Sequence, residues 1–404
     1  MSGGRTRGRA LLLVTVVCLA LLAGCSSAGK GGAGAGGGSA TAPIPAGDIV
    51  FGETLPLSGP LGQTGTFEKF SVDTVVTELN ASGGIAGHQV KVLTLDDKGD
   101  PATALANAET LIQTDKVAAV LNGSLGAGSA LTVPYFMKVG VPTVLAESNT
   151  DFLDVSKYPS YFTSYASAAQ YATEYVTFAR DHQLNDLGTL SDGSPIANQA
   201  SQQVAAQAPA AGLKVTAAVT YSPTAVDLTT QMLQLKNAGT KVVVLDGFAA
   251  VAHVYGALRQ IGWSPVVMGV GVGSATLQSV GTLAGQSYYP CTYYYAAPGG
   301  QPSGAAKAVI DKMIPQFGVS TTSSGVLGWY DILNTLKAGI EKAHSLSYGA
   351  VVKAIESGQP VPSVWPDISY RYTAGNHEGW PDGALKLCKL SPLSGGGVGI
   401  AASQ

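Results

Sequence analysis

The sequence predicts an α/β protein with parallel sheets in two domains, and three observations carry this prediction. Short runs of β-type residues alternate with helical patterns from Asp48 onward. The alternation resumes after Tyr165, so it occurs in two successive sets. The chain has 404 residues, and a length of this order favours two domains over one. Strand–helix alternation implies a parallel sheet that is covered by helices on both faces.

The first set opens on an expected strand at 49–55, followed by apolar residues at helical spacing between 72 and 79. Gly83-Gly84 stops this helix. Asp100 is a candidate N-cap before Pro101, which predicts the start of another helix. The other elements expected in this set are strands at 90–95, 117–121 and 141–145 and a helix at 129–138.

The second set repeats this order of elements after Tyr165. Its expected strands lie at 187–190, 215–221, 242–245 and 266–270, and its expected helices at 171–178, 228–235 and 253–261.

The N-terminal segment at 1–24 has the pattern of an export signal: three arginines, then about 13 apolar residues, which are too few to cross a bilayer. Leu22-Ala23-Gly24-Cys25 resembles the lipobox of bacterial lipoproteins, in which the cysteine receives a lipid and becomes the new N-terminus. The alternative is an ordinary signal peptide with an incidental cysteine. Residues 25–46 are rich in Gly, Ala and Ser and predict a flexible tether between the lipid anchor and the folded protein.

Removal of residues 1–24 leaves a net charge of −6 and no basic block, which argues against a nucleic-acid partner.

Cys18 leaves with the signal and Cys25 carries lipid, so Cys291 and Cys388 remain to form one disulfide outside the cytoplasm. Neither has neighbours at metal-ligand spacing, so no metal site is expected. The G-x-S-x-G, phosphate-loop and H-E-x-x-H motifs are absent, and we expect no catalytic residues and no cofactor.

Three stretches carry a resemblance to one family: TLPLSGPLGQTG (54–65), ELNASGGIAGHQVKVLTLDDKGDP (78–101) and DLTTQMLQLKNAGTKVVVLDG (227–247). Together they resemble the type I periplasmic solute-binding proteins of ABC importers, in the branched-chain amino acid branch. The resemblance covers about residues 48–390. It implies two Rossmann-like lobes with parallel sheets, joined by three crossover strands, with the solute in the cleft between the lobes.

The resemblance also implies where the lobes begin and end. The tail would return to the second lobe, close to Cys291, which agrees with a disulfide to Cys388. The implied ranges are 47–164 and 295–375 for lobe 1, 165–294 and 376–404 for lobe 2, and crossovers near 163–165, 293–295 and 372–383.

In open parallel sheets, ligands lie beyond the carboxyl ends of the strands. The glycine-rich loop at 122–129 lies there, before a helix start that favours negative charge. In the resembled family this loop and the loop after the next strand hold the carboxylate of the solute, although the glycines could simply make a tight turn. The residues implied here are Gly126, Ala127, Gly128 and Ser129 in the first loop and Glu147, Ser148 and Asn149 in the second.

Two departures from the family concern the solute. Amino acid binders of the family carry an acid after the strand that corresponds to 266–270, and the stretch 268–276 has none. Glu147 stands where the family has a small residue. A carboxylate there either receives a cationic or hydrogen-bond-donating group of the solute or forms a salt bridge at the rim of the cleft. Both departures argue against a plain leucine-type solute.

Four further residues are candidate solute contacts. Thr64 occupies a position where an aromatic ring often covers the solute in the family. The other three follow strand ends of the second lobe: Asn198, Asp246 and Phe248.

The function implied is a lipid-anchored receptor on the outer face of the cytoplasmic membrane, which closes on a small polar organic solute. It would act as a monomer and deliver the solute to an ABC permease and ATPase complex. The alternative from another class is a ligand-sensing receptor of the same fold that is coupled to a signalling partner. Neighbouring permease genes would favour transport, and a neighbouring kinase gene would favour sensing. An enzyme is a third alternative without supporting motifs.

Overall fold

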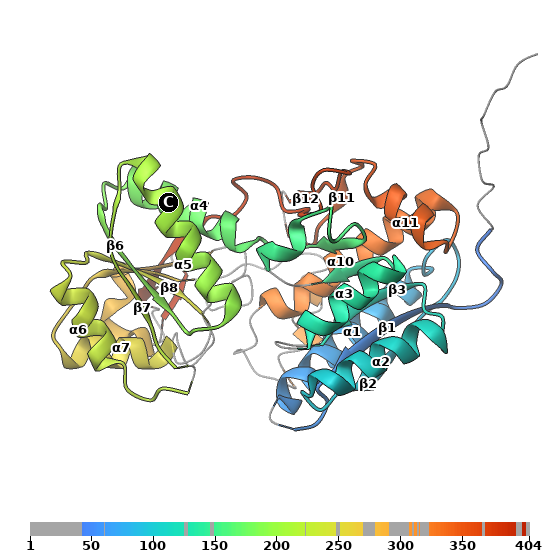
Figure 1. Cartoon of the computed structure of the whole chain (residues 1–404), viewed down its shortest axis with the longest axis horizontal. Helices are drawn as coiled ribbons and strands as arrows, with labels where there is room; N and C mark the ends of the chain where they lie inside the picture. Colours follow the sequence, from blue (N-terminus) through green and yellow to red (C-terminus); the bar gives the residue numbers. More distant parts are fainter. Residues whose placement is uncertain are drawn as a thin grey trace, which may run out of the picture. The chain divides into compact units, whose positions relative to one another are not determined.

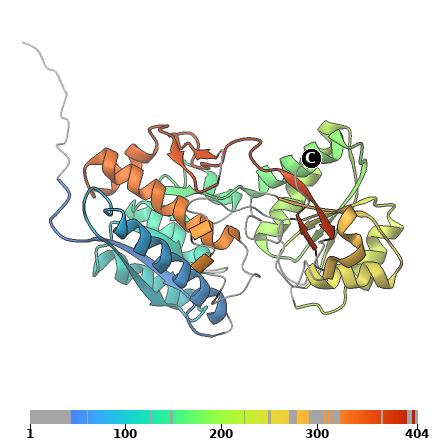
Figure 2. The same cartoon turned by 180° about the vertical axis from the view of Figure 1, so that it is seen from behind.

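The computed structural model describes the chain from residue 43 onward with several gaps, and every described residue belongs to the unit Thr41–Gln404 (Figures 1 and 2). The expected export signal, Cys25 and most of the expected tether lie outside the described residues. Among the described residues, no helix combines the length and the apolar character that a membrane span needs. The described ranges are 43–59, 61–124, 128–145, 149–222, 224–247, 251–269, 279–290, 307–308, 311–312, 315, 323–365, 368–392 and 398–400.

One sheet has five strands in the order β2-β1-β3-β4-β5, and every neighbouring pair in it is parallel. Its strands are β1 (Ile49–Leu55), β2 (Val90–Asp96), β3 (Ala119–Gly123), β4 (Thr143–Leu145) and β5 (Tyr161–Thr163). The helices between them are α1 (Gly62–Ala81), α2 (Pro101–Gln113), α3 (Ser129–Val139) and the short 3₁₀ helix η1 (Thr150–Leu153) (Figure 1).

Alternate residues of β1 face different helices. Ile49 and Phe51 are fully buried in the main apolar cluster, which also contains Val72 of α1. Gly52 faces the other side, where an added Cβ would lie 3.0 Å from Leu111 of α2. The sheet is therefore covered on both faces, as parallel sheets generally are.

The pairing of β1 with β3 contains a shift in register. Gly52 lies opposite Val120, but Glu53 lies opposite Asn122, so Leu121 is an extra residue on β3. Such a β-bulge lets two successive residues face the same side of a sheet. Here Leu121 packs in the main apolar cluster, and the side chain of Asn122 donates a hydrogen bond to α1 on the same face.

The other large sheet has seven strands in the order β14-β13-β10-β9-β8-β6-β7. The pairs from β7 to β10 are parallel, whereas β13 and β14 join antiparallel. Its strands are β6 (Asp186–Ser191), β7 (Lys214–Thr220), β8 (Val242–Asp246), β9 (Val266–Gly269), β10 (Ser287–Pro290), β13 (Leu387–Pro392) and β14 (Val398–Ile400). Its helices are α4 (Ala168–Asp181), α5 (Pro195–Gln207), η2 (Ala208–Ala211), α6 (Thr229–Asn237), α7 (Val251–Gln260) and η3 (Gly281–Gln286).

Segments from late in the chain complete both sheets. The helices α10 (Ser323–Ala343) and α11 (Tyr348–Ile355), orange in Figure 2, pack beside the five-stranded sheet. Tyr330 of α10 donates a hydrogen bond to Glu78 of α1, and Tyr348 donates one to the carbonyl of Val117 at 2.8 Å. The strands β11 (Val361–Pro362) and β12 (Ser369–Tyr370) form a small antiparallel pair of their own. The residue ranges expected for the two lobes stay a prediction.

The return of β13 to the seven-stranded sheet places Cys388 directly opposite Tyr289 of β10. Cys388 is disulfide-bonded. Cys291 lies outside the described residues, so its pairing with Cys388 stays a prediction.

The expected α/β class with parallel sheets is confirmed, and most expected elements are present within one or two residues. Asp100 caps α2 as expected, because its carboxylate accepts a hydrogen bond from the backbone N–H of Thr103 at 2.7 Å. The strand expected at 117–121 begins and ends two residues later, at Ala119 and Gly123. The strand expected at 141–145 is shorter and begins at Thr143.

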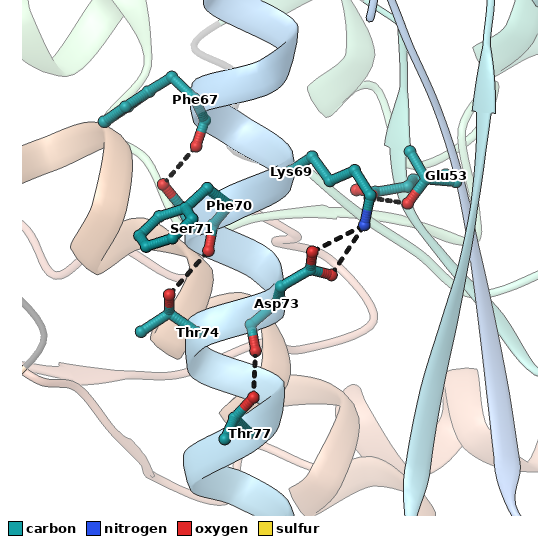
Figure 3. A network of polar contacts seen from close by, with 9 residues as sticks. Glu53, Phe67, Lys69, Phe70, Ser71, Asp73, Thr74 and Thr77 are labelled. Carbon is teal, nitrogen blue, oxygen red and sulfur yellow. Dashed lines mark hydrogen bonds and ion pairs between the residues drawn. The ribbon is translucent and has the colours of Figure 1, made fainter. Parts of the chain in front are cut away.

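A buried carboxyl group lies near the carboxyl end of β1 in the five-stranded sheet. Glu53 of β1 is fully buried, and its Oε1 accepts a hydrogen bond from Thr94 of β2 at 2.7 Å. Lys69 of α1 extends toward Glu53 and pairs with Asp73 at 2.7 Å (Figure 3). Burial raises the pKa of Glu53 to about 8, and the nearby carboxylate of Glu68 adds to the rise.

We expect the free energy of unfolding to fall as the pH rises from about 5 to about 8, because the folded protein keeps a proton on Glu53 that the unfolded chain releases. Each proton held in this way adds about 1.4 kcal/mol per pH unit to the slope. Glu53→Gln removes the titrating group, so the free energy of unfolding of this variant should change less steeply with pH, by up to about 1.4 kcal/mol per pH unit. Urea unfolding at several pH values measures both slopes.

The matched control is Glu109→Gln on the exposed side of α2, which should keep the wild-type slope. Identical slopes for the wild type and Glu53→Gln would contradict the expectation.

Candidate functional site

The candidate site lies at the carboxyl ends of the parallel strands, where the sequence analysis placed the solute. Of the two loops on the five-stranded sheet, the structure describes Gly128, Ser129 and Asn149. The other candidates of these loops lie outside the described residues: Gly126, Ala127, Glu147 and Ser148.

Ser124, just after β3, and Gly128, just before α3, lie close together and leave no room for a side chain at Gly128. Ser124 is almost buried and has a positive φ of 83°, an unusual backbone conformation for a residue other than glycine. A Cβ added to Gly128 would lie 2.4 Å from the hydroxyl of Ser124. Thr132 of α3 donates a hydrogen bond back to the carbonyl of Gly123, which fixes the helix against the end of β3.

The first turn of α3 has the character of an anion-binding site. Its N-cap residue is Gly128, which has no side chain to accept a hydrogen bond from the first backbone N–H groups. The first turn also holds no acidic residue. The helix dipole favours a negative group at such a position. A solute carboxylate fits this chemistry.

Asn149 has a local structural role. Its Oδ1 accepts a hydrogen bond from the backbone N–H of Asp151 at 3.0 Å, which caps η1. The same oxygen accepts a hydrogen bond from Gln199 of α5 at 3.1 Å, and Gln199 in turn accepts one from the backbone N–H of Thr150 at 3.2 Å. The sequence analysis missed Gln199, although it selected the adjacent Asn198.

Asn198 closes the turn between β6 and α5. Its Oδ1 accepts a hydrogen bond from Ser191 at 2.7 Å, and its amide donates one to the carbonyl of Gly193 at 3.1 Å. Both polar atoms of the side chain are therefore engaged within the turn. Thr64, by contrast, is exposed on α1, and Phe248 lies outside the described residues.

Asp246 ends β8 and is fully buried. Its Oδ2 accepts a hydrogen bond from Ser201 at 3.0 Å, and its Oδ1 has no partner. Burial raises the pKa of Asp246 well above its usual range, and the nearby carboxylate of Asp192 adds to the rise. A protonated Asp246 can donate a hydrogen bond as well as accept one.

Asp192 is a second acid at this edge that the sequence analysis missed. It follows β6, and its Oδ1 accepts hydrogen bonds from the backbone N–H and the hydroxyl of Ser194 at 3.0 and 2.6 Å. Gly247 has a φ of 139°, and a Cβ there would lie 2.6 Å from the carboxylate of Asp192. The rule that selected Asp246, a polar residue just after a strand, would also have selected Asp192.

The described part of the chain holds no group of three or more His, Cys, Asp or Glu side chains that could bind a metal ion. Its chemistry at the strand ends consists of backbone N–H groups, small residues and hydrogen-bonded polar side chains. Such a set can bind and orient a small polar molecule.

Comparison with known proteins identifies the family. A sequence model of the family described as "Periplasmic binding protein" matches residues 48–385. The Leu/Ile/Val-binding protein BraC3 of Rhizobium johnstonii is 26% identical over an alignment of 355 residues, and the match covers 82% of this chain and 90% of that protein.

Solved structures agree in fold. A branched-chain amino acid ABC transporter protein from Thermus thermophilus with bound valine has a TM-score of 0.71 at 16% identity, covering 88% of this chain and 97% of its own. A solute-binding protein of an ABC transporter from Rhodopseudomonas palustris BisB5, in complex with 3,4-dihydroxybenzoic acid, has a TM-score of 0.70 at 16% identity, covering 88% and 96%. The chain therefore belongs to the periplasmic binding protein family, whose members are extracytoplasmic solute-binding proteins rather than enzymes, and it has the type I fold.

Proposed function

We propose that the chain is a lipid-anchored receptor on the outer face of the cytoplasmic membrane, which closes on a small polar organic solute of amino acid-like or amide-like chemistry. It delivers the solute, as a monomer, to the permease and ATPase complex of an ABC importer. The observation that carries the proposal is the family match, because residues 48–385 include strands of both large sheets. Solute shifts the equilibrium between open and closed forms by contacts that exist only in the closed form.

The negative end of the solute binds at the first turn of α3. The start of α3 supports this assignment, since its first turn has no capping side chain and no acidic residue, and the positive end of the helix dipole favours an anion. Two proteins of similar fold were solved with valine and with 3,4-dihydroxybenzoic acid, and both of these molecules carry a carboxyl group. A carboxylate is the feature that the two molecules share.

Glu147 and its neighbours Ser148 and Asn149 receive the other polar groups of the solute. The stretch 268–276 has no acid that could pair with an ammonium group, so Glu147 is the available carboxylate in the predicted loops. It pairs with a cationic or hydrogen-bond-donating group of the solute. Asn198, Asp246 and Phe248 complete the site from the seven-stranded sheet.

A screen of ligand-induced thermal stabilisation tests the function. The probes are L-valine, L-glutamine, 3,4-dihydroxybenzoate and a polyamine, with isobutylamine and catechol as matched controls that lack the carboxyl group of the first and third. A bound solute at 100 times its dissociation constant should stabilise the protein by about 2.7 kcal/mol. We expect a carboxylate or amide to do so and its decarboxylated control to fail. Equal stabilisation by a carboxylate and its control would contradict the assignment to α3.

Glu147→Gln keeps the shape of the side chain and removes its charge. A charge-assisted hydrogen bond contributes roughly 1.5–3 kcal/mol, so the affinity should fall about 10- to 150-fold for the solute that the screen identifies. Calorimetric titration measures the affinity, and Glu109→Gln on α2 is the matched control. Unchanged affinity would make Glu147 a rim residue, and a large fall in the unliganded melting temperature would make it a structural ion-pair partner.

Cys25 carries the anchor in this proposal. Its position after a short apolar segment and before the Gly-rich tether supports lipidation. Cys25→Ala should leave the folded protein intact and abolish stable membrane attachment, which fractionation after a high-salt wash measures. Retention of the variant in the membrane fraction would contradict the lipid anchor.

Cys291 and Cys388 form the disulfide of the exported protein. Tyr289 lies opposite Cys388 in the ladder and only two residues before Cys291, which supports the pairing. A bond that closes so long a loop contributes on the order of 2–4 kcal/mol to stability. It ties the returning tail to the seven-stranded sheet.

A further inference from the structure

Two glutamates lie next to Asn122 near the end of β3, one on the neighbouring strand β1 and one on the covering helix α1. Glu53 of β1 is fully buried beside Asn122 in the ladder, and Glu68 of α1 accepts a hydrogen bond from the side-chain amide of Asn122 at 2.9 Å. Asn122 is the last residue before Gly123 and Ser124, which lead into the proposed solute loop. A shift of Asn122 therefore reaches the start of that loop through Gly123 and Ser124.

Glu53 is incompletely paired. Its Oε1 accepts the hydrogen bond from Thr94, but its Oε2 is buried without a partner. An ionised carboxylate with a bare buried oxygen is costly, whereas a protonated carboxyl group is neutral and can donate a hydrogen bond. The geometry thus favours a proton on Glu53 while the fold is intact.

No nearby positive charge in the described part of the chain is left to stabilise the ionised forms of Glu53 and Glu68. On α1, Lys69 is already paired with Asp73 at 2.7 Å, so its positive charge is shared (Figure 3). The partners on β2 and β3 are the uncharged Thr94 and Asn122.

The charged side chains of α10, which packs against α1, are engaged elsewhere. Asp331 accepts a hydrogen bond from Tyr370 at 2.7 Å, and Lys337 pairs with Glu341.

We propose that Glu53 and Glu68 hold one proton between them near neutral pH, and that Asn122 transmits its presence to the loop between β3 and α3. Glu53 and Glu68 are then positioning residues for solute binding. This role rests on the proposed function, in which the loop binds the solute. Loss of the proton places two negative charges next to Asn122 and moves the start of the loop. A solute carboxylate at α3 favours the protonated pair, so solute and proton bind cooperatively and solute affinity falls as the pH rises.

The test follows the ligand-free protein by NMR from about pH 5.5 to about pH 9. The backbone amides of Gly123 and Ser124 and the side-chain amide of Asn122 should shift together in two steps, near the raised pKa values of the two carboxyl groups, about 7 for Glu68 and about 8 for Glu53. Glu53→Gln should abolish the part of the titration above neutral pH, and Glu68→Gln the part near neutral pH. Glu109→Gln on α2 is the matched control and should keep the wild-type titration.

Infrared spectra of the wild type give a second measurement, which does not depend on whether the variants fold. The carbonyl band of a protonated carboxyl group should be present at low pH and lost as these amides titrate. Amides that do not titrate, or that titrate identically in Glu53→Gln and Glu68→Gln, would overturn the proposal. Neither measurement uses a solute, so this failure is separate from a failure of the ligand screen, which would instead reject the proposed function.

Discussion

Each strand of the parallel arrays has to bury side chains on both faces, and the covering helices come both from between the strands and from distant parts of the chain. In β1, Phe51 packs toward α1 while Gly52 leaves room for Leu111 of α2. The helices α10 and α11 reach the same sheet from residues 323–355, far beyond its last strand at Tyr161–Thr163. Both large sheets are completed by segments from late in the chain, α10 and α11 on one and β13 and β14 on the other. The candidate site at the strand ends therefore depends on the fold of the whole chain.

The same constraint explains the buried acids. The carboxyl ends of the strands carry polar residues, yet the covering helices exclude water from several of them. Asp246 and Glu53 are both fully buried, and each retains one carboxyl oxygen without a partner. Such groups lower the stability of a sheet unless they are neutral. Their presence at the strand ends, beside the proposed solute loops, favours a role in binding over a role in stability.

The sequence predicts the class and most of the strands because apolar runs, turn residues and caps act locally. The strand from Ile49 to Leu55 has both ends correct. The strand expected at 117–121 is displaced because Val117 and Ala118 are apolar and buried but lie before the ladder, which instead extends over the polar Asn122 and over Gly123. Propensity disfavours both of these residues in a strand, and only the neighbouring strand supplies their partners.

The candidate site is less predictable than the fold. The rule that ligands lie beyond strand ends finds the loop at 122–129 and the residues Asn198 and Asp246, but it does not tell which side chains turn inward. The bonds from Ser191 to Asn198 and from Ser201 to Asp246 depend on distances that the sequence does not contain. Glu53 was missed as well, since an acid between Gly52 and Thr54 in a strand has the pattern of a solvent-facing position.

The bulge in β3 has a consequence for how the length of this strand can change over evolution. Ala119 and Val120 alternate between the two faces, and the extra residue Leu121 is followed by Asn122 on the face of α1. Deletion of Leu121 would leave every other residue of β3 on its present face, because it would only restore strict alternation. Deletion of Val120 would turn Leu121 toward the helices on the opposite face. Loss of one residue from β3 is therefore tolerable at the bulge itself, at Leu121 or Asn122, because strict alternation then keeps the remaining residues on their present faces.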